Sequence, residues 1–424
     1  MNKPSVAPSP PTAPTPEQQF LRLRIALTLF FALGGFLFAG WAIRIPAIKE
    51  QTHASPASLG LALFCMTAAA VVSMLVTGRL CRRFGSRRMT VTAAALLSAT
   101  VFLSPLTHSA PTLGLVLIVF GAAYGGIDVA GNSVAVELIQ ATDRPLMPGF
   151  HAANSLGSLA GAGLGGLLAT SLTPTRHLLL LVPVGLAATA LGGRVLLSTP
   201  TPARRAAGAA PATDRQDRPD TAGRGSARVR PDVLVFGVLG LCAAYSQGAL
   251  DTWVPLHISD DLDGGPGVAA AGYATVTLML ALGRLLGTRL LERLGQTAVV
   301  TAGGLAAGAA MVVAALSTQP WLVFAGLAVT GLGLANIFPV AMARAGAAGG
   351  PDGVALASTL GYSGILVAPP SIGFLAQGLG LPVALNAIAV MIVASGVIAY
   401  AARNRGVPAA RGTARTPVEE NNPA

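Results

Sequence analysis

The sequence predicts an all-α membrane protein in which 12 transmembrane helices form two related six-helix bundles. Of its 424 residues, 53% are hydrophobic and only 11% are charged, whereas about a quarter of an average soluble domain is charged. Twelve stretches are apolar over the roughly 20 residues that a helix needs to cross hydrocarbon. A polar segment after the sixth stretch, with similar sequences on its two sides, divides the chain into halves.

The first half begins with residues 1–20, which are rich in Pro, Ser and Thr and lack an apolar core. We expect a disordered N-terminal tail there and not a cleavable signal. The N-terminal six-helix bundle is predicted over 21–197, with spans at 21–43, 57–78, 89–107, 112–136, 148–170 and 177–197. Residues 198–231 are too polar to bury a core, so they are predicted to be a flexible linker.

The second bundle is predicted over 232–403, followed by a disordered tail at 404–424. Its spans are 233–256, 268–287, 298–317, 321–343, 354–378 and 382–402. The apolar signal is weakest in the ninth and eleventh spans, where Gly and Ala dominate and Pro369 and Pro370 interrupt the run. Such residues are tolerated in membrane helices because neighbouring helices satisfy the freed backbone groups.

The basic residues predict the orientation, because Lys and Arg stay on the cytoplasmic side. With the N-terminus inside, 23 of them fall in cytoplasmic segments and three in outer segments, namely Arg44, Lys49 and Arg176. Arg194 and Arg284 lie near the inner ends of predicted helices, where snorkelling to the surface explains them. Both termini are therefore expected in the cytoplasm, with the protein in the inner or plasma membrane.

The halves are similar at an offset of 210 residues. Residues 78–85 align with 288–295 with four of eight positions identical, and Gly121 falls on Gly331. A slightly different offset aligns 153–157 with 357–361. Such matches in corresponding helices indicate parallel repeats.

The loop after the second span carries the most specific motif. Gly78, Leu80, Arg83 and Gly85 fit the pattern Gly-x-Leu-x-Asp-Arg-x-Gly-Arg-Lys/Arg, and Arg87 and Arg88 supply its two basic residues one position later. The chain therefore resembles the major facilitator superfamily over its full helical length. The acidic position of the pattern is held by Arg82, whereas the second copy has Glu292 ahead of Arg293. The resemblance implies gating roles for Gly78, Arg83, Gly85, Glu292 and Arg293. In that superfamily the acid helps to hold the outward-facing state closed on the other side, and the first copy, with Arg82, lacks this acid. The alternative is a simple positive-inside stop signal.

Within that superfamily, the fourth span is similar to the fucose permease type of sugar–proton symporter. That group places an acid four residues before an Asn, as in Asp128 and Asn132, and the stretch from Gly331 to Pro339 is also similar. The group has a further acid in its first helix, but residues 34–46 contain none. A rival resemblance is to drug–proton antiporters, whose Gly-rich motif is similar to residues 157–166, with Ala162 in place of Pro. A helix-packing face would produce much the same string.

Two acids lie within predicted spans, where a charge costs roughly 2.5 to 3.5 kcal/mol and indicates function. Asp128 shares a helix face with Tyr124 and Asn132, four residues away on either side. A carboxyl group in low-dielectric surroundings can exchange a proton near neutral pH. We expect Asp128 to couple proton or substrate binding; the alternative is a carboxyl held within the packed bundle.

Asp251 shares its face with Gln247 in the seventh span. One interpretation places both at a central cavity. The other makes Asp251 a gate residue paired with Arg44 at the outer end of the first helix, and the two interpretations are equally supported.

Three further polar residues are candidates for binding the solute or protons. His151 suits proton exchange or an interfacial hydrogen bond, and Asn154 and Asn336 suit a hydroxyl-bearing substrate or bonds across helices. The acidic run Asp260, Asp261 and Asp263 is interpreted as a solvated outer loop.

These observations favour a proton-coupled secondary transporter of a small, sugar-like solute that works by alternating access. An efflux antiporter for a drug or metabolite is the main alternative, and a non-transporting membrane receptor is a further one. The chain has no ATP-binding Gly-x-x-x-x-Gly-Lys-Ser/Thr motif. Five scattered His residues do not indicate an enzyme. No compact basic face indicates nucleic acid. We expect no cofactor, and a monomer whose partners are the solute, protons and lipid.

Overall fold

The computed structural model describes residues 15–142, 144, 146–200 and 231–403. These residues form helices and no strand. The helices of the first half are α1 (Pro16–Ala42), α2 (Ile45–Gln51), α3 (Pro56–Phe84), α4 (Ser86–Thr100), η1 (Ser104–Leu106), α5 (Ala110–Thr142), α6 (Met147–Ala169) and α7 (Pro174–Ser198). Those of the second half are α8 (Pro231–Asp260), α9 (Pro266–Leu294), α10 (Gln296–Leu316), α11 (Pro320–Leu334), α12 (Ile337–Leu379), α13 (Leu381–Ala384) and α14 (Asn386–Ala401).

The predicted all-α membrane fold is confirmed. Within the described residues, 11 helical stretches are long and apolar enough to cross a membrane, including the predicted ninth and eleventh spans. The remaining predicted span, 148–170, forms the 23-residue helix α6, whose Gly, Ser, His and Asn residues lower its apolarity. The break between α11 and α12 at Asn336 lies within the stretch Pro320–Gly350, and the non-helical Gly350 inside α12 separates that stretch from Gly353–Leu379.

Helix ends extend beyond the predicted spans, because hydropathy detects only the apolar part of a helix. The predicted tail 1–20 is wrong for residues 16–20, which belong to α1. Thr15 caps this helix by accepting from the Gln18 N–H, and the Gln18 side chain accepts from the Thr15 N–H. The rest of that tail, most of the linker and the C-terminal tail lie outside the described residues.

The repeat predicted from the sequence is visible in the helix boundaries. Helices α3, α4 and α5 begin at residues 56, 86 and 110, and α9, α10 and α11 begin 210 residues later in each case. The glycines that end α3 and α9, Gly85 and Gly295, have φ of 90° and 79°. Because these values are favourable only for glycine, the shared loop motif specifies one backbone conformation twice.

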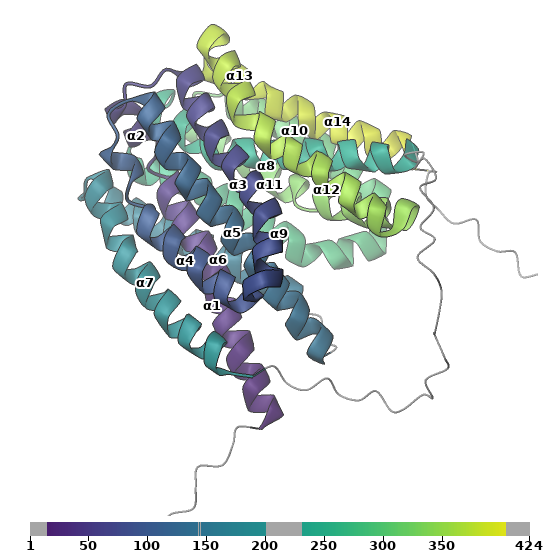
Figure 1. Ribbon diagram of the computed structural model, residues 1–424. Coiled ribbons are helices and arrows are strands. Elements are labelled where there is room, and N and C mark those ends of the chain that lie inside the picture. The colour runs from purple at the N-terminus through teal and green to yellow at the C-terminus, as the bar shows by residue number, and fades with distance from the viewer. Residues whose placement is uncertain (1–14, 143, 145, 201–230, 404–424) are drawn as a thin grey trace, which may run out of the picture.

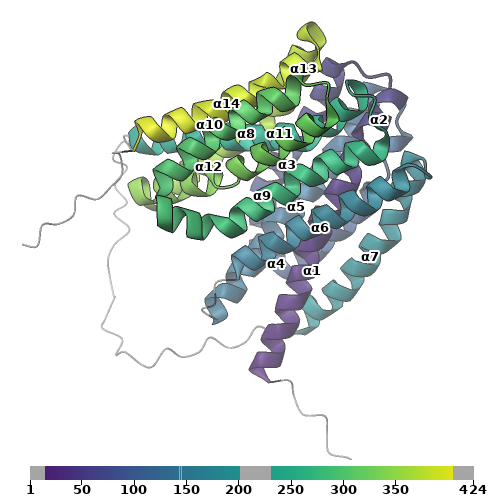
Figure 2. The same ribbon diagram turned by 180° about the vertical axis from the view of Figure 1, so that it is seen from behind.

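The two halves meet through α3 with α12, α6 with α9, and α2 with α8. They converge on the side where α2 lies and diverge toward the side where α1 begins and α14 ends (Figure 1; Figure 2). We call these sides the α2 face and the terminal face. On α3 and α12, glycines allow the closest approach: a Cβ built on Gly60 would lie 2.7 Å from the Pro369 carbonyl oxygen. The interface of the halves is therefore a seam of small residues near the α2 face.

Candidate functional site

A cavity of about 290 Å³ lies between the two halves. One face of α9 contributes Tyr273, Thr277 and Arg284, spaced so that they follow one stripe of the helix. Gln247 and Asp251 contribute from α8 at a spacing of four. The remaining polar lining comes from Thr67, Tyr124, Asn154, Ser155, Ser158, Thr252 and Tyr362. Hydroxyl, amide and charged groups from both halves thus converge on one space.

The apolar part of the wall comes from side chains of α1, α3, α9 and α12. Its larger side chains are Phe38, Met66, Val71, Met74, Leu280, Phe338 and Ile365. A pocket that is largely apolar with a few convergent polar groups is the usual form of a small-molecule site.

Arg284 and Asp251 carry opposite charges in this cavity. The Arg284 Nη2 donates to the Gln247 Oε1 at 3.0 Å. The two charged groups interact electrostatically. Among the ion pairs of the described residues, none joins them within 4.0 Å. The cavity therefore holds a cation and an acid that do not neutralise each other through a direct contact.

Asp128 lies one turn along α5 from Tyr124, on the edge of the cavity and not within its wall. It borders two further spaces, one shared with Tyr124 and Asn154 and one shared with Asn132 and Tyr362. The Asn132 Nδ2 donates to the Asp128 Oδ1 at 3.2 Å and to its backbone carbonyl at 2.8 Å. The predicted stack of carboxyl, phenol and amide groups is present, and its carboxyl is held by a neighbour on its own helix.

The other predicted polar residues differ in their surroundings. Asn154 lines the cavity, and its Nδ2 donates to the Phe31 carbonyl at 3.1 Å. Asn336 is buried away from the cavity and donates to the Gly283 carbonyl at 2.9 Å. This bond across helices corresponds to the second of its two predicted alternatives. His151 is exposed and packs edge-on against the Phe31 ring at 5.7 Å.

The structure does not bring Arg44 and Asp251 together. Arg44 is buried within the first half, and its Nε donates to the His177 Nδ1 at 2.9 Å. Burial lowers the pKa of Arg44 to about 10, so its guanidinium stays charged at neutral pH. The predicted Arg44–Asp251 gate is replaced by the alternative that placed Asp251 at the cavity.

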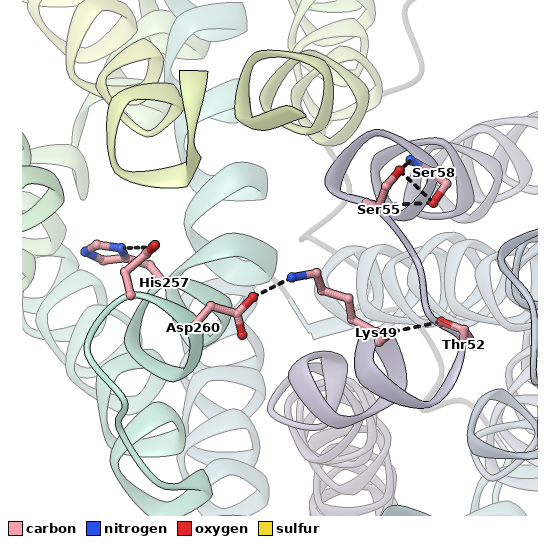
Figure 3. Close-up of polar contacts among 7 residues, drawn as sticks. Lys49, Thr52, Ser55, Ser58, His257 and Asp260 are labelled. Atoms are coloured by element: carbon pink, nitrogen blue, oxygen red, sulfur yellow. Dashed lines mark hydrogen bonds and ion pairs between the residues drawn. The ribbon is translucent and has the colours of Figure 1, made fainter. Parts of the chain in front are cut away.

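A different ion pair joins the halves at the α2 face. Lys49 of α2 lies 2.5 Å from Asp260 at the end of α8, and Figure 3 shows the two side chains pointing toward each other. His257 anchors that end of α8, because its ring bonds Asp261 at 2.7 Å and the Ala314 carbonyl at 3.1 Å. The acidic run is therefore not merely a solvated loop, which is a correction of the sequence-based interpretation.

The residues of the loop motif lie at the terminal face. Gly78 has open space around it, and Arg83, Gly85, Glu292 and Arg293 lie toward the surface. The Arg83 guanidinium lies over the Phe84 ring at 5.2 Å. Arg87 of the same motif donates to the Leu196 and Thr199 carbonyls at the end of α7. The gating role of the motif stays a prediction.

Sequence reasoning missed Arg284, Tyr273 and Thr277. Arg284 was assigned to snorkelling because the eighth span was expected to end at 287, but α9 continues to Leu294. Two further helical turns move Arg284 away from the helix end. Its spacing of seven from Thr277 and 11 from Tyr273 was the signal that could have found this stripe.

The sequence model of the Major Facilitator Superfamily matches residues 25–360. The chain belongs to this superfamily. An uncharacterised MFS-type transporter of Yersinia pestis is 30% identical over 374 residues, covering 87% of this chain and 93% of that protein. The membrane protein MosC of Rhizobium meliloti is 30% identical over 376 residues, covering 88% of this chain and 87% of its own length.

Solved structures share the fold. The nucleoside transporter NupG superposes with a TM-score of 0.66 at 14% identity, covering 90% of this chain and 98% of that one. An inward-facing bacterial homologue of the human lysosomal transporter Spinster gives 0.67 at 15% identity, covering 92% and 98%. The fucose–proton symporter FucP of E. coli gives 0.58 at 16% identity, covering 90% and 98%. The major facilitator fold expected from the loop motif is thus confirmed.

Proposed function

We propose that the protein is a proton-coupled secondary transporter that moves a small, sugar-like solute across the inner or plasma membrane by alternating access. The observation that carries this proposal is the cavity between the two halves, because its lining combines hydroxyl, amide and aromatic groups with the acid Asp251. Its volume of about 290 Å³ is at the small end for ligand sites, which favours a solute of monosaccharide size. NupG and FucP, by their names, carry a nucleoside and fucose, and both solutes are polyhydroxylated.

The basic residues support the orientation. With both termini in the cytoplasm, the terminal face is cytoplasmic and the α2 face is external. The Lys49–Asp260 pair and the α3–α12 seam then close the outer side, which makes this the inward-facing conformation. Asp251 carries the proton in this scheme, and Asp128 at the cavity edge is the second candidate.

A proton-driven efflux antiporter is the second candidate function. The apolar wall formed by Met66, Met74 and Phe338 favours it. The Gly-rich sequence of α6 does not add support for efflux, because Gly157 and Gly161 pack directly against the α1 backbone at Ala32 and Phe36. That packing accounts for the sequence without a transport role.

Purified protein in liposomes tests both functions with a panel of radiolabelled sugars, nucleosides and hydrophobic compounds under pH gradients of either sign. Symport predicts accumulation only when the acidic side is the one that corresponds to the α2 face. Asp251→Asn should abolish this accumulation and leave exchange of labelled for unlabelled solute in place. Accumulation with the opposite gradient establishes efflux instead, and transport indifferent to both gradients refutes proton coupling.

A further inference from the structure

Among the described residues that line the cavity, Arg284 is the side chain that keeps a fixed positive charge. A guanidinium has five N–H donors and is not deprotonated in proteins. Gln247 is its hydrogen-bond acceptor among the described residues, through a single Nη2 contact. The side chain is exposed and lines the cavity. The remaining donors therefore face space that a ligand can occupy.

Its potential counter-ion in the same wall is Asp251. The two groups line one cavity without an ion pair within 4.0 Å, and the Asp251 carboxylate accepts no hydrogen bond from the described residues. An Asp carboxylate can be neutralised by a proton, whereas the Arg charge is permanent. When Asp251 is protonated, the cavity holds an uncompensated positive charge in low-dielectric surroundings, where an unpaired charge is costly.

We propose that Arg284 binds a carboxylate on the transported solute, so that the solute class is a sugar acid or a similar small hydroxylated organic acid. This inference deepens and rests on the proposed transport function. Arg presents a planar fork that matches a carboxylate with two parallel hydrogen bonds. Gln247 positions the guanidinium by accepting from one Nη group and leaves the other donors for the solute.

The surrounding wall fits the rest of such a solute. The hydroxyls of Tyr273 and Thr277 lie on the same stripe of α9, and Asn154 and Ser158 face from α6. These groups can donate to and accept from sugar hydroxyls, while the apolar wall can pack against the ring face. The charged end of the solute is thus placed at Arg284 and its hydroxyl-bearing body toward the first half.

This arrangement links solute charge to the proton. One proton enters on the Asp251 carboxylate with one carboxylate bound at Arg284, and both leave on the other side. The loaded carrier then has the same net charge as the empty one, because the added proton offsets the added anion. Transport should therefore respond to a pH gradient and not to a membrane potential.

Binding to the full-length protein in lipid nanodiscs, measured by calorimetry, tests the assignment with matched probes. Glucuronate and galacturonate are the anionic probes, glucose and galactose the neutral ones, and glucosamine the cationic one. We expect each acid to bind at least about tenfold more tightly than its neutral counterpart. Arg284→Gln should remove that preference, weakening acid binding by about tenfold to a hundredfold, as expected for hydrogen bonds to a charged group. Binding of the neutral sugars should weaken by much less, so that the ratio of acid to neutral affinity falls toward one.

Matched variants exclude a merely structural effect. Arg194 is also an arginine inside a membrane span, but its side chain is exposed on α7 away from the cavity lining, so Arg194→Gln should keep the acid preference. Arg284→Lys keeps the positive charge but lacks the planar fork of donors. Its preference for acids over neutral sugars should lie between those of the wild type and of Arg284→Gln. The double variant Arg284→Gln/Asp251→Asn removes both charges, and its neutral-sugar binding reports whether the cavity remains folded.

Equal loss of acid and neutral binding in Arg284→Gln overturns the assignment, and so does tighter binding of glucosamine than of the acids. Absence of binding by every probe also overturns it. The proposed function fails separately, when no solute of the broad panel accumulates under either pH gradient. In liposomes, accumulation of glucuronate that doubles or more under a potassium–valinomycin potential refutes the electroneutral cycle.

Discussion

Gly157 and Gly161 of α6 show how single residues set the distance between helices. A Cβ on Gly157 would lie 2.0 Å from the Ala32 carbonyl oxygen, and one on Gly161 would lie 2.3 Å from that of Phe36. Both contacts are with α1 backbone, which cannot rotate away as a side chain can. Lipid does not drive helices together as water does, so such close backbone packing is a main source of stability for the bundle.

Gly157→Ala should therefore destabilise the first half by about 1 to 3 kcal/mol, the usual cost of overpacking. The measurement is thermal unfolding of the purified protein in detergent, followed by loss of the monodisperse species. Gly163→Ala is the matched control, because nothing lies within 4 Å of a Cβ built there on the same helix. Equal shifts of the melting temperature in the two variants would contradict the packing argument.

Single residues also mark the limit of prediction from the sequence. Asp128 and Asp251 were found because an acid in an apolar run is conspicuous. Arg284 was not, because its assignment depended on where α9 ends, and the polar last turns of a helix carry no hydropathy signal. Asn336 shows the opposite error. Its amide side chain within an apolar span suggests a substrate ligand, but in the structure it bonds the Gly283 carbonyl, and only the tertiary packing determines that contact.

At the scale of elements, the end of α8 and the short helix α2 form one of the contacts that join the halves at the α2 face, beside the α3–α12 seam. The sequence did not predict α2, and the ion pair that it offered across the halves, Arg44 with Asp251, has the wrong partners. The Lys49–Asp260 pair depends on how two separately predicted segments meet, which the sequence does not show. It did predict the repeat, which the structure shows in the common 210-residue spacing of three helix starts and in the positive φ at both Gly85 and Gly295.

Lys49→Glu or Asp260→Lys alone should open the α2 face, and the double reversal should restore closure. The side chains are 22% and 35% exposed, so the pair is worth at most about 1 kcal/mol. Each single variant should therefore raise the ratio of molecules open at the α2 face to molecules closed there by about twofold to fivefold. The assay is labelling of Thr277→Cys, in a background without Cys65, Cys81 and Cys242, by a membrane-impermeant thiol reagent added at the α2 face.

The Arg144–Glu17 pair supplies the control for this assay. It lies within the first half, with a nitrogen–oxygen distance of 3.1 Å, so Glu17→Lys and Arg144→Glu should leave the labelling rate unchanged. A labelling rate that stays high in the Lys49→Glu/Asp260→Lys double variant would show that closure does not depend on the attraction between these charges.

For the whole molecule, the seam between α3 and α12 decides which face of the cavity is closed. Gly60 and Gly373 form its tightest point, because a Cβ on Gly373 would lie 2.6 Å from the Pro56 carbonyl oxygen and 3.0 Å from the Gly60 Cα. In the alternating access that we propose, these backbones separate when the α2 face opens. A side chain at the seam is therefore strained in the closed state and relieved in the open state, which gives it a differential effect on the two states.

Gly373→Val should accordingly shift the population toward the conformation open at the α2 face. Overpacking of about 1 to 3 kcal/mol in the closed state alone corresponds to about fivefold to 150-fold in the ratio of the two states. The same thiol assay at position 277 should report faster labelling from the α2 face. Gly378→Val is the matched control on α12, since no atom lies within 4 Å of a Cβ there. If both variants label at the wild-type rate while Gly373→Val remains folded, the seam does not separate during the cycle, and the two halves must open the cavity by another movement.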